Sequence, residues 1–152
     1  MGQSIDRRSI LGYVGTAAAL LLASAPPSYA ATTQFKADLK GSTEVPPNQS
    51  SGTGSVTATF DSVSKELTWS GTYSGLSGPA TAAHIHGPAE AGKNAGVAIW
   101  ISEKGKPFDS PFKGSATLTD AQASDLMAGL WYINIHTAAN PGGELRGQLV
   151  KS

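Results

Sequence analysis

The histidines of this chain are few and closely grouped. The 152 residues contain three, His84, His86 and His136, and the first two are separated only by Ile85. Neutral imidazole is a ligand for copper and zinc, and the ligand-strength order favours copper(II). A His-x-His pair with a third histidine from another segment therefore predicts a metal site with three nitrogen ligands. In the alternative interpretation, the same imidazoles make hydrogen bonds at the surface or between strands and hold no metal.

Strand alternation would place these histidines on polar faces. On a β-strand, residues i and i+2 point to the same face, so His84 and His86 would lie side by side with Ile85 turned to the core. In residues 130–136, LWYINIH, the polar side chains alternate with bulky apolar ones, and His136 falls in the polar set. Both segments are thus predicted to bury apolar side chains inward and to present histidines on the other face.

Two charged residues follow His136 beyond a turn, Asn140-Pro141-Gly142-Gly143. Glu144 is a candidate for orienting a metal-bound imidazole, since such ligands need a hydrogen-bond partner; alternatively it is a solvated strand-end charge or pairs with Arg146. Arg146 could draw a small anion towards a bound metal, or it could satisfy loop carbonyl groups. No Gly-x-Ser-x-Gly elbow and no P-loop occurs, so hydrolase chemistry is not indicated and no catalytic residue is assigned.

The composition excludes several kinds of partner. Removing residues 1–30 would take away Arg7, Arg8 and Asp6, leaving nine basic and ten acidic residues and a net charge of −1. This balance predicts neither nucleic-acid binding nor attraction to an anionic membrane. The chain has no cysteine, so the fold must form without disulfides and any metal site must use nitrogen and oxygen ligands.

The N-terminus is typical of an export signal. Arg7 and Arg8 precede the apolar run of residues 10–25, and small residues flank a cleavage position before Ala31. The run is shorter than the roughly 20 apolar residues of a spanning helix and contains two glycines, although a retained anchor is the alternative. The segment DRRSILG also resembles a twin-arginine signal, so that route and ordinary secretion both stay open. The mature domain, residues 31–152, is expected in the periplasm or outside the cell.

Beyond residue 30, short alternating runs broken by glycine, proline and serine predict an all-β domain. The expected strands are residues 34–40, 54–61, 66–73, 81–87, 96–102, 113–119, 130–136 and 144–150. Eight short strands at this spacing indicate an immunoglobulin-like or Greek-key β-sandwich. One short helix is expected near residues 119–128, where Thr119 and Gln122 fit a capping box, Gly129 fits a C-terminal stop, and Leu126 and Met127 would pack inward.

Four ordered blocks of the chain resemble the CHRD domain, a module named after its occurrence in chordin. They are LKGSTEVPPNQSSGTGSV (39–56), YSGLSGPATAAHIHGPA (73–89), PFKGSATLT (111–119) and GLWYINIHTAANPGGELRGQL (129–149). The resemblance implies an immunoglobulin-like β-sandwich that occurs in bacteria as a single exported module. It implies no particular activity, because a shared fold does not fix function.

A looser resemblance links the histidines to the copper-containing superoxide dismutases, β-sandwiches in which a strand-borne His-x-His and a later histidine bind copper. His84, His86 and His136 would correspond to those ligands, while a fourth histidine, an aspartate-rich zinc loop and a cysteine pair are missing. The resemblance implies a copper-only site with a position open to solvent, used for copper binding or for redox chemistry such as superoxide dismutation. The rival hypothesis is a metal-free interaction or structural module with an unknown protein partner.

Overall fold

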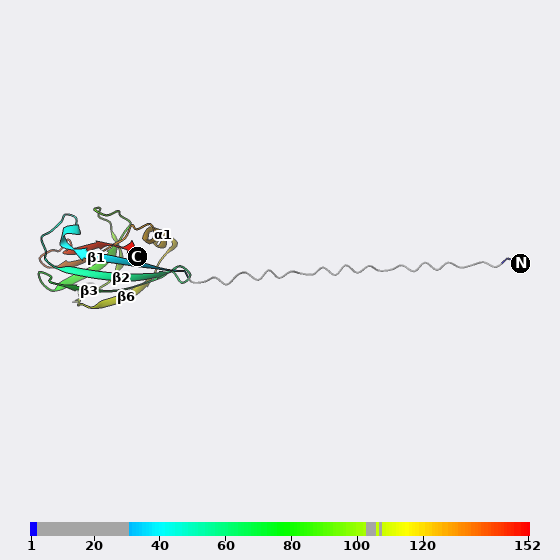
Figure 1. Ribbon diagram of the computed structural model, residues 1–152, viewed down its shortest axis with the longest axis horizontal. Helices are drawn as coiled ribbons and strands as arrows, with labels where there is room; N and C mark the ends of the chain where they lie inside the picture. Colours follow the sequence, from blue (N-terminus) through cyan, green and yellow to red (C-terminus); the bar gives the residue numbers. More distant parts are fainter. Residues whose placement is uncertain (3–30, 103–105, 107) are drawn as a thin grey trace.

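The computed structural model describes residues 1–2, 31–102, 106 and 108–152 (Figure 1). The expected export segment therefore lies almost wholly outside the described residues. The strands are β1 (Thr32–Lys40), β2 (Thr53–Asp61), β3 (Glu66–Ser74), β4 (Ala80–His86), β5 (Val97–Trp100), β6 (Phe112–Thr117), β7 (Tyr132–Thr137), β8 (Leu145–Gln148) and β9 (Val150–Lys151). The helices are the short 3-10 helix η1 (Gly41–Thr43) and α1 (Asp120–Met127). The expected all-β class is confirmed, and only the last expected strand is divided, into β8 and β9.

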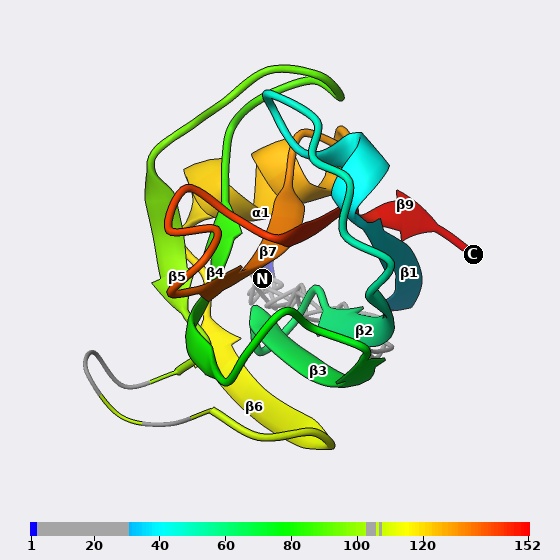
Figure 2. The ribbon, with the colours of Figure 1, turned by 90° about the vertical axis from the view of Figure 1, so that its left-hand side faces the viewer.

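The strands form one antiparallel sheet in the order β5-β4-β7-β8-β1-β2-β3-β6, with β9 on β1. The sheet curls so that its two halves face each other, with β4, β5 and β7 on one side and β1, β2, β3 and β6 on the other (Figure 2). A single residue pair, Lys40 with Arg146, joins β1 to β8. Successive strands cross between the halves, from β3 to β4 and from β5 to β6, as in Greek-key sandwiches.

The core lies between the two halves and is built by strand alternation. In β1 the side chains of Phe35, Ala37 and Leu39 are buried and the residues between them are exposed. From the facing half, Ile85 of β4 and Ile133 of β7 are fully buried. Each of the large side chains among them contributes on the order of 1.5–3 kcal/mol of hydrophobic free energy. This packing holds β4 and β7 rigidly, and their outer faces are therefore fixed as well.

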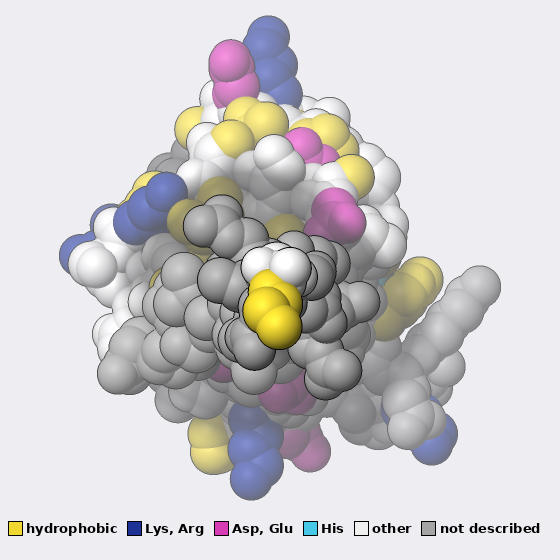
Figure 3. Space-filling view, turned by 90° about the vertical axis from the view of Figure 1, so that its right-hand side faces the viewer, with side chains coloured by type: hydrophobic (Ala, Val, Ile, Leu, Met, Phe, Trp, Pro, Cys, Tyr) yellow, Lys and Arg dark blue, Asp and Glu magenta, His cyan; other side chains and the backbone are white. Residues whose placement is uncertain are grey.

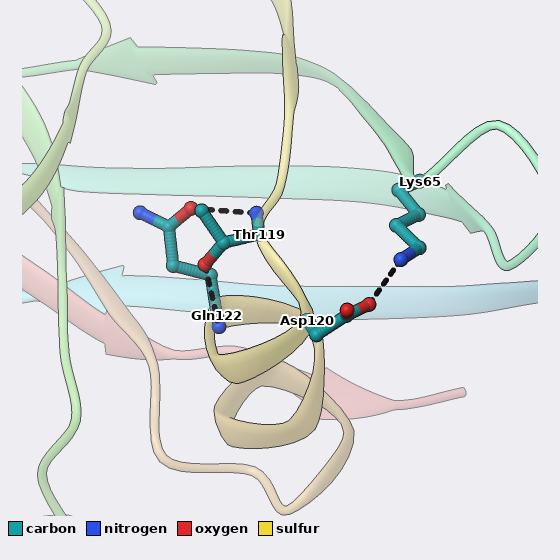
Figure 4. A network of polar contacts seen from close by, with 4 residues as sticks. All are labelled: Lys65, Thr119, Asp120 and Gln122. Atoms are coloured by element: carbon teal, nitrogen blue, oxygen red, sulfur yellow. Dashed lines mark hydrogen bonds and ion pairs between the residues drawn. The ribbon is translucent and has the colours of Figure 1, made fainter.

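The helix α1 follows the expected capping pattern. The Thr119 hydroxyl accepts a hydrogen bond from the main chain of Gln122, and the Gln122 side chain accepts one from the main chain of Thr119 (Figure 4). Figure 4 also shows the ion pair between Lys65 and Asp120 at the first turn. Leu126 is buried as expected, but the inward packing expected of Met127 is wrong. Met127 is the last helical residue and stays 37% exposed, because Leu126 alone of the two faces the sheet.

On the coloured part of the surface in Figure 3, basic and acidic side chains both occur among uncharged ones, and neither charge forms a large patch. This distribution agrees with the balanced composition. Within the described part of the chain, no helix has both the length and the apolar character needed to cross a bilayer.

Candidate metal centre

The three histidines meet on the outer face of neighbouring strands. Strand β4 pairs with β7 so that His84 lies opposite Asn134 and Ala82 lies opposite His136. As alternation predicts, Ile85 enters the core while His84 and His86 turn to the other face. One ring nitrogen from each of the three histidines lies within 4.8 Å of the other two. Residues separated by about fifty positions in the sequence thus form one cluster.

The closest approach joins two imidazoles. Nδ1 of His84 lies 3.0 Å from Nε2 of His136. Two nitrogens bound to one ion at about 2.0–2.1 Å, with roughly 90–110° between them, lie about 2.8–3.4 Å apart. The spacing of this pair already suits a shared metal ion.

Main-chain carbonyl groups orient the other two imidazoles. Nδ1 of His136 lies 2.9 Å from the carbonyl oxygen of Pro141, in the turn between β7 and β8. Nδ1 of His86 lies 3.0 Å from the carbonyl oxygen of Ala95, in the loop after β4. A carbonyl only accepts, so each Nδ1 donates and each Nε2 is the nitrogen left for another partner. Metal-bound histidines usually have this kind of support.

Burial favours the neutral forms of His84 and His136. Burial, with the nearby His136 and His86, lowers the pKa of His84 from 6.5 to about 4. Burial also lowers the pKa of His136, partly opposed by its hydrogen bond to Pro141. Neutral imidazole is the form that binds metals. His84 and His136 are therefore held in the form that binds a metal near neutral pH.

Trp100 stands at the edge of the cluster. It lies opposite His84 in the pairing of β4 with β5, and the two rings meet edge to face with centroids 4.2 Å apart. His84 is only 7% exposed, whereas Trp100 is 50% exposed. The indole thus separates the buried imidazole from solvent at the open edge of the sheet.

Arg146 belongs to a stack beside the cluster. The ring of Tyr132 lies parallel to that of His86, with centroids 4.9 Å apart, and the guanidinium of Arg146 lies 3.5 Å from the centre of the Tyr132 ring. The guanidinium also donates to the side chain of Asn94 and to the carbonyl of Lys93. Arg146 is 2% exposed. It donates hydrogen bonds to loop residues and packs on an aromatic ring rather than facing solvent.

Glu144 does not contact an imidazole. It is fully buried and accepts hydrogen bonds from Ser50, Ser77, Thr137 and Asn140. Burial alone would raise its pKa, but the hydrogen bonds from Ser77, Thr137 and Ser50 outweigh it and hold the pKa at about 2. The carboxylate fixes the turn that carries Pro141, and through this turn it acts on His136 indirectly.

Sequence reasoning missed Glu44 and gave Asn134 no role. Asn134 is 3% exposed, and its Oδ1 lies 3.0 Å from Nε2 of His86. Glu44 is 4% exposed, and burial raises its pKa to about 7, with Arg146, the Val45 main chain and Asn134 offsetting only part of the shift. The alternation that grouped Asn134 with His136 was the available signal for Asn134. Glu44 lies in a proline-rich loop whose sequence gives no sign of burial.

One comparison with known proteins gives a match. The family model of the CHRD domain matches residues 35–149. No curated protein and no solved structure shows a significant match. The matched range includes all three histidines and every strand from β2 to β8.

Proposed function

Starting from a chain that belongs to the CHRD domain family, we propose that this protein binds one copper ion through His84, His86 and His136. The observation that carries the proposal is the convergence of three ring nitrogens within 4.8 Å. Export to the periplasm or the medium is part of the proposal, since residues 1–30 have the pattern of a signal peptide.

The positions of the ring protons support a cation between His84 and His136. Nε2 of His136 carries a lone pair, because its Nδ1 donates to Pro141. With a proton on Nδ1, His84 donates to that lone pair and leaves its own Nε2 buried without a hydrogen-bond partner among the described residues. With the proton on Nε2, two lone pairs face each other at 3.0 Å. A cation held between the two nitrogens removes this repulsion between lone pairs.

The donor set favours copper. It consists of three imidazole nitrogens, with no thiolate because the chain lacks cysteine. Among divalent metals of the first row, such nitrogen ligands bind copper(II) most tightly, and zinc is the alternative. Three protein ligands leave a position for solvent or a small molecule. Copper in such a site can also cycle between two oxidation states, which is the chemistry that superoxide dismutation requires.

Binding or storage of copper has more support than catalysis. Steering of an anion needs a cation that the anion can approach, and Arg146 is 2% exposed and engaged by Tyr132, Asn94 and Lys93. Among the described residues, no carboxyl group lies with the three histidines to donate a proton to a reduced product. Superoxide turnover is therefore the second use to test, after binding.

The test is a copper titration followed by two signals. Bound copper(II) should quench the emission of Trp100, whose ring lies 4.2 Å from that of His84, and electron paramagnetic resonance should give a nitrogen-rich signal with one equivalent bound. Trp69 and Trp131 are buried in the core and remain in the Trp100→Phe variant. That variant should bind copper by resonance but lose most of the quenching.

The controls separate a site from adventitious binding. His84→Ala should lose the resonance signal, while the exposed Glu90→Gln should keep it. If the wild-type protein binds neither copper(II) nor zinc, the proposal is refuted and the rival hypothesis of a metal-free interaction module is favoured. If copper binds, a superoxide assay decides whether it turns over.

A further inference from the structure

Trp100 covers the His84 side of the histidine cluster. It is the last residue of β5, which forms one end of the sheet beside β4 (Figure 2). It lies opposite His84 in the pairing of β4 with β5, and the centroids of the two rings are 4.2 Å apart. His84 is 7% exposed, whereas Trp100 is 50% exposed. The indole therefore shields a buried imidazole while much of its own surface stays in contact with water.

Hydrogen bonds fix the other two imidazoles of the cluster. Nδ1 of His136 is bonded to the carbonyl of Pro141, and Nδ1 of His86 is bonded to the carbonyl of Ala95. The turn that contains Pro141 is held in its place by a hydrogen bond to the buried carboxylate of Glu144. A metal that passed between His136 and this turn would have to displace these contacts.

The loop beside His86 is fixed in the same way. The main-chain N–H of Ala95 donates to the hydroxyl of Tyr132, whose ring stacks on His86. The guanidinium of Arg146, which lies against the Tyr132 ring, donates to the side chain of Asn94. This side of the cluster is therefore held by polar contacts that cross from the loop to β7 and β8.

The cover that Trp100 provides is held by fewer contacts. In the part of the chain that the structure describes, its indole makes a ring contact with His84 and no side-chain hydrogen bond. Strand β5 has only four residues and pairs with β4 alone. Rotation of this one side chain would therefore uncover His84 without breaking a hydrogen bond.

We propose that Trp100 controls access to the metal, so that copper enters and leaves the three-histidine site past this indole. The inference rests on the proposed copper site and adds the route by which that site exchanges its metal with external ligands. A side chain that blocks this route slows uptake and release alike. Because the dissociation constant is the ratio of the two rates, removal of the indole should change the rates more than the affinity.

The first test needs no metal and measures whether Trp100 covers His84. The metal-free wild-type protein, Trp100→Ala and Val97→Ala are treated with diethyl pyrocarbonate, and the modification of each histidine is followed by tandem mass spectrometry, with His136 as the internal reference. Val97 is the matched control, because it is an exposed apolar residue of the same strand that lies opposite His86 and not His84. His84 should react faster in Trp100→Ala alone.

Two outcomes of this test would overturn the proposal. Equal reaction rates of His84 in the wild-type protein and Trp100→Ala would show that the indole does not cover the imidazole. An equally fast reaction of His84 in Val97→Ala would show that loosening of β5, and not loss of the indole, exposes it.

The second test is the release of copper(II) to excess EDTA in a stopped-flow experiment, with the affinity measured separately by titration. An edge-to-face ring contact makes opening of the cover rarer by roughly 2- to 12-fold, so Trp100→Ala should release copper faster by about this factor at a nearly unchanged affinity. Trp100→Phe keeps an aromatic ring at this position and should restore slow release. Faster release with an equal loss of affinity would overturn the proposal, because Trp100 would then hold His84 in place and not control access.

The two tests separate this inference from the proposed function. If His84 is uncovered in Trp100→Ala but the wild-type protein binds no copper, the proposed function is refuted and the control of metal access is refuted with it. If copper binds but the wild-type protein, Trp100→Ala and Trp100→Phe release it at the same rate, the metal site stands and only the role of Trp100 is refuted.

Discussion

The sharpest prediction on stability concerns the buried carboxylate of Glu144. Glu144→Gln keeps the shape of the side chain but removes the charge that Ser50, Ser77 and Thr137 stabilise. These hydrogen bonds hold the pKa at about 2, against an ordinary value of 4.5. A difference of this size corresponds to about 3 kcal/mol of folding free energy above pH 5, at 1.36 kcal/mol per pH unit.

The sign follows from the lowered pKa. The folded state binds the Glu144 proton more weakly than the unfolded state, so the stabilisation is present above pH 4.5 and is lost as the pH falls towards 2. At pH 3 roughly 2 kcal/mol of it is gone. The wild-type protein should therefore lose this amount between pH 7 and pH 3 through Glu144, and the variant should not.

The assay is urea unfolding of both proteins at pH 7 and at pH 3. The variant should be less stable by about 3 kcal/mol at pH 7, and the difference should shrink by about 2 kcal/mol at pH 3. The exposed Glu90→Gln should stay within about 0.5 kcal/mol of the wild-type protein at pH 7. Parallel pH profiles for the wild-type protein and Glu144→Gln would refute the reasoning, because they would show that the charge of Glu144 does not contribute.

The other predictions concern the core, the site and the helix. Ile133→Ala removes a fully buried side chain and should lower the unfolding free energy by about 2–5 kcal/mol in urea; a smaller loss would contradict the packing. Gly143→Ala would bring a Cβ within 2.3 Å of Oε1 of Glu44 at a φ of +134°, so it should melt at a lower temperature, whereas an unchanged melting temperature would refute the close contact. The ring protons of His84 should titrate in NMR near pH 4, and a midpoint near 6.5 would show that the imidazole is not buried. Thr119→Ala should lower the free energy of unfolding in urea by about 1 kcal/mol, because α1 loses its N-cap. Equal stability would show that the capping box contributes nothing.

The sequence by itself determined the elements and the faces of the site strands. The period of two in residues 130–136 depends only on backbone geometry, so it places Ile133 inward and His136 outward wherever the strand lies. The capping box of Thr119 and Gln122 is equally local, and the helix begins where it predicts. The prediction that Met127 packs inward was wrong, because the angle at which a short helix meets a sheet depends on the neighbouring elements and not on the residues of the helix alone.

Only the tertiary structure decided what surrounds the histidines. The pairing of β4 with β7 brings His136 to His84, and no local pattern sets that register. The pKa of Glu44 is raised and that of Glu144 is lowered. Because the two side chains are chemically identical, the difference comes from their surroundings in the folded protein. Glu144 is buried among hydroxyl groups that donate to it, whereas Oε1 of Glu44 lacks a close hydrogen-bond partner among the described residues. Burial raises the free energy of any charged group. Whether a buried carboxylate stays ionised therefore depends on the hydrogen-bond donors that distant loops supply.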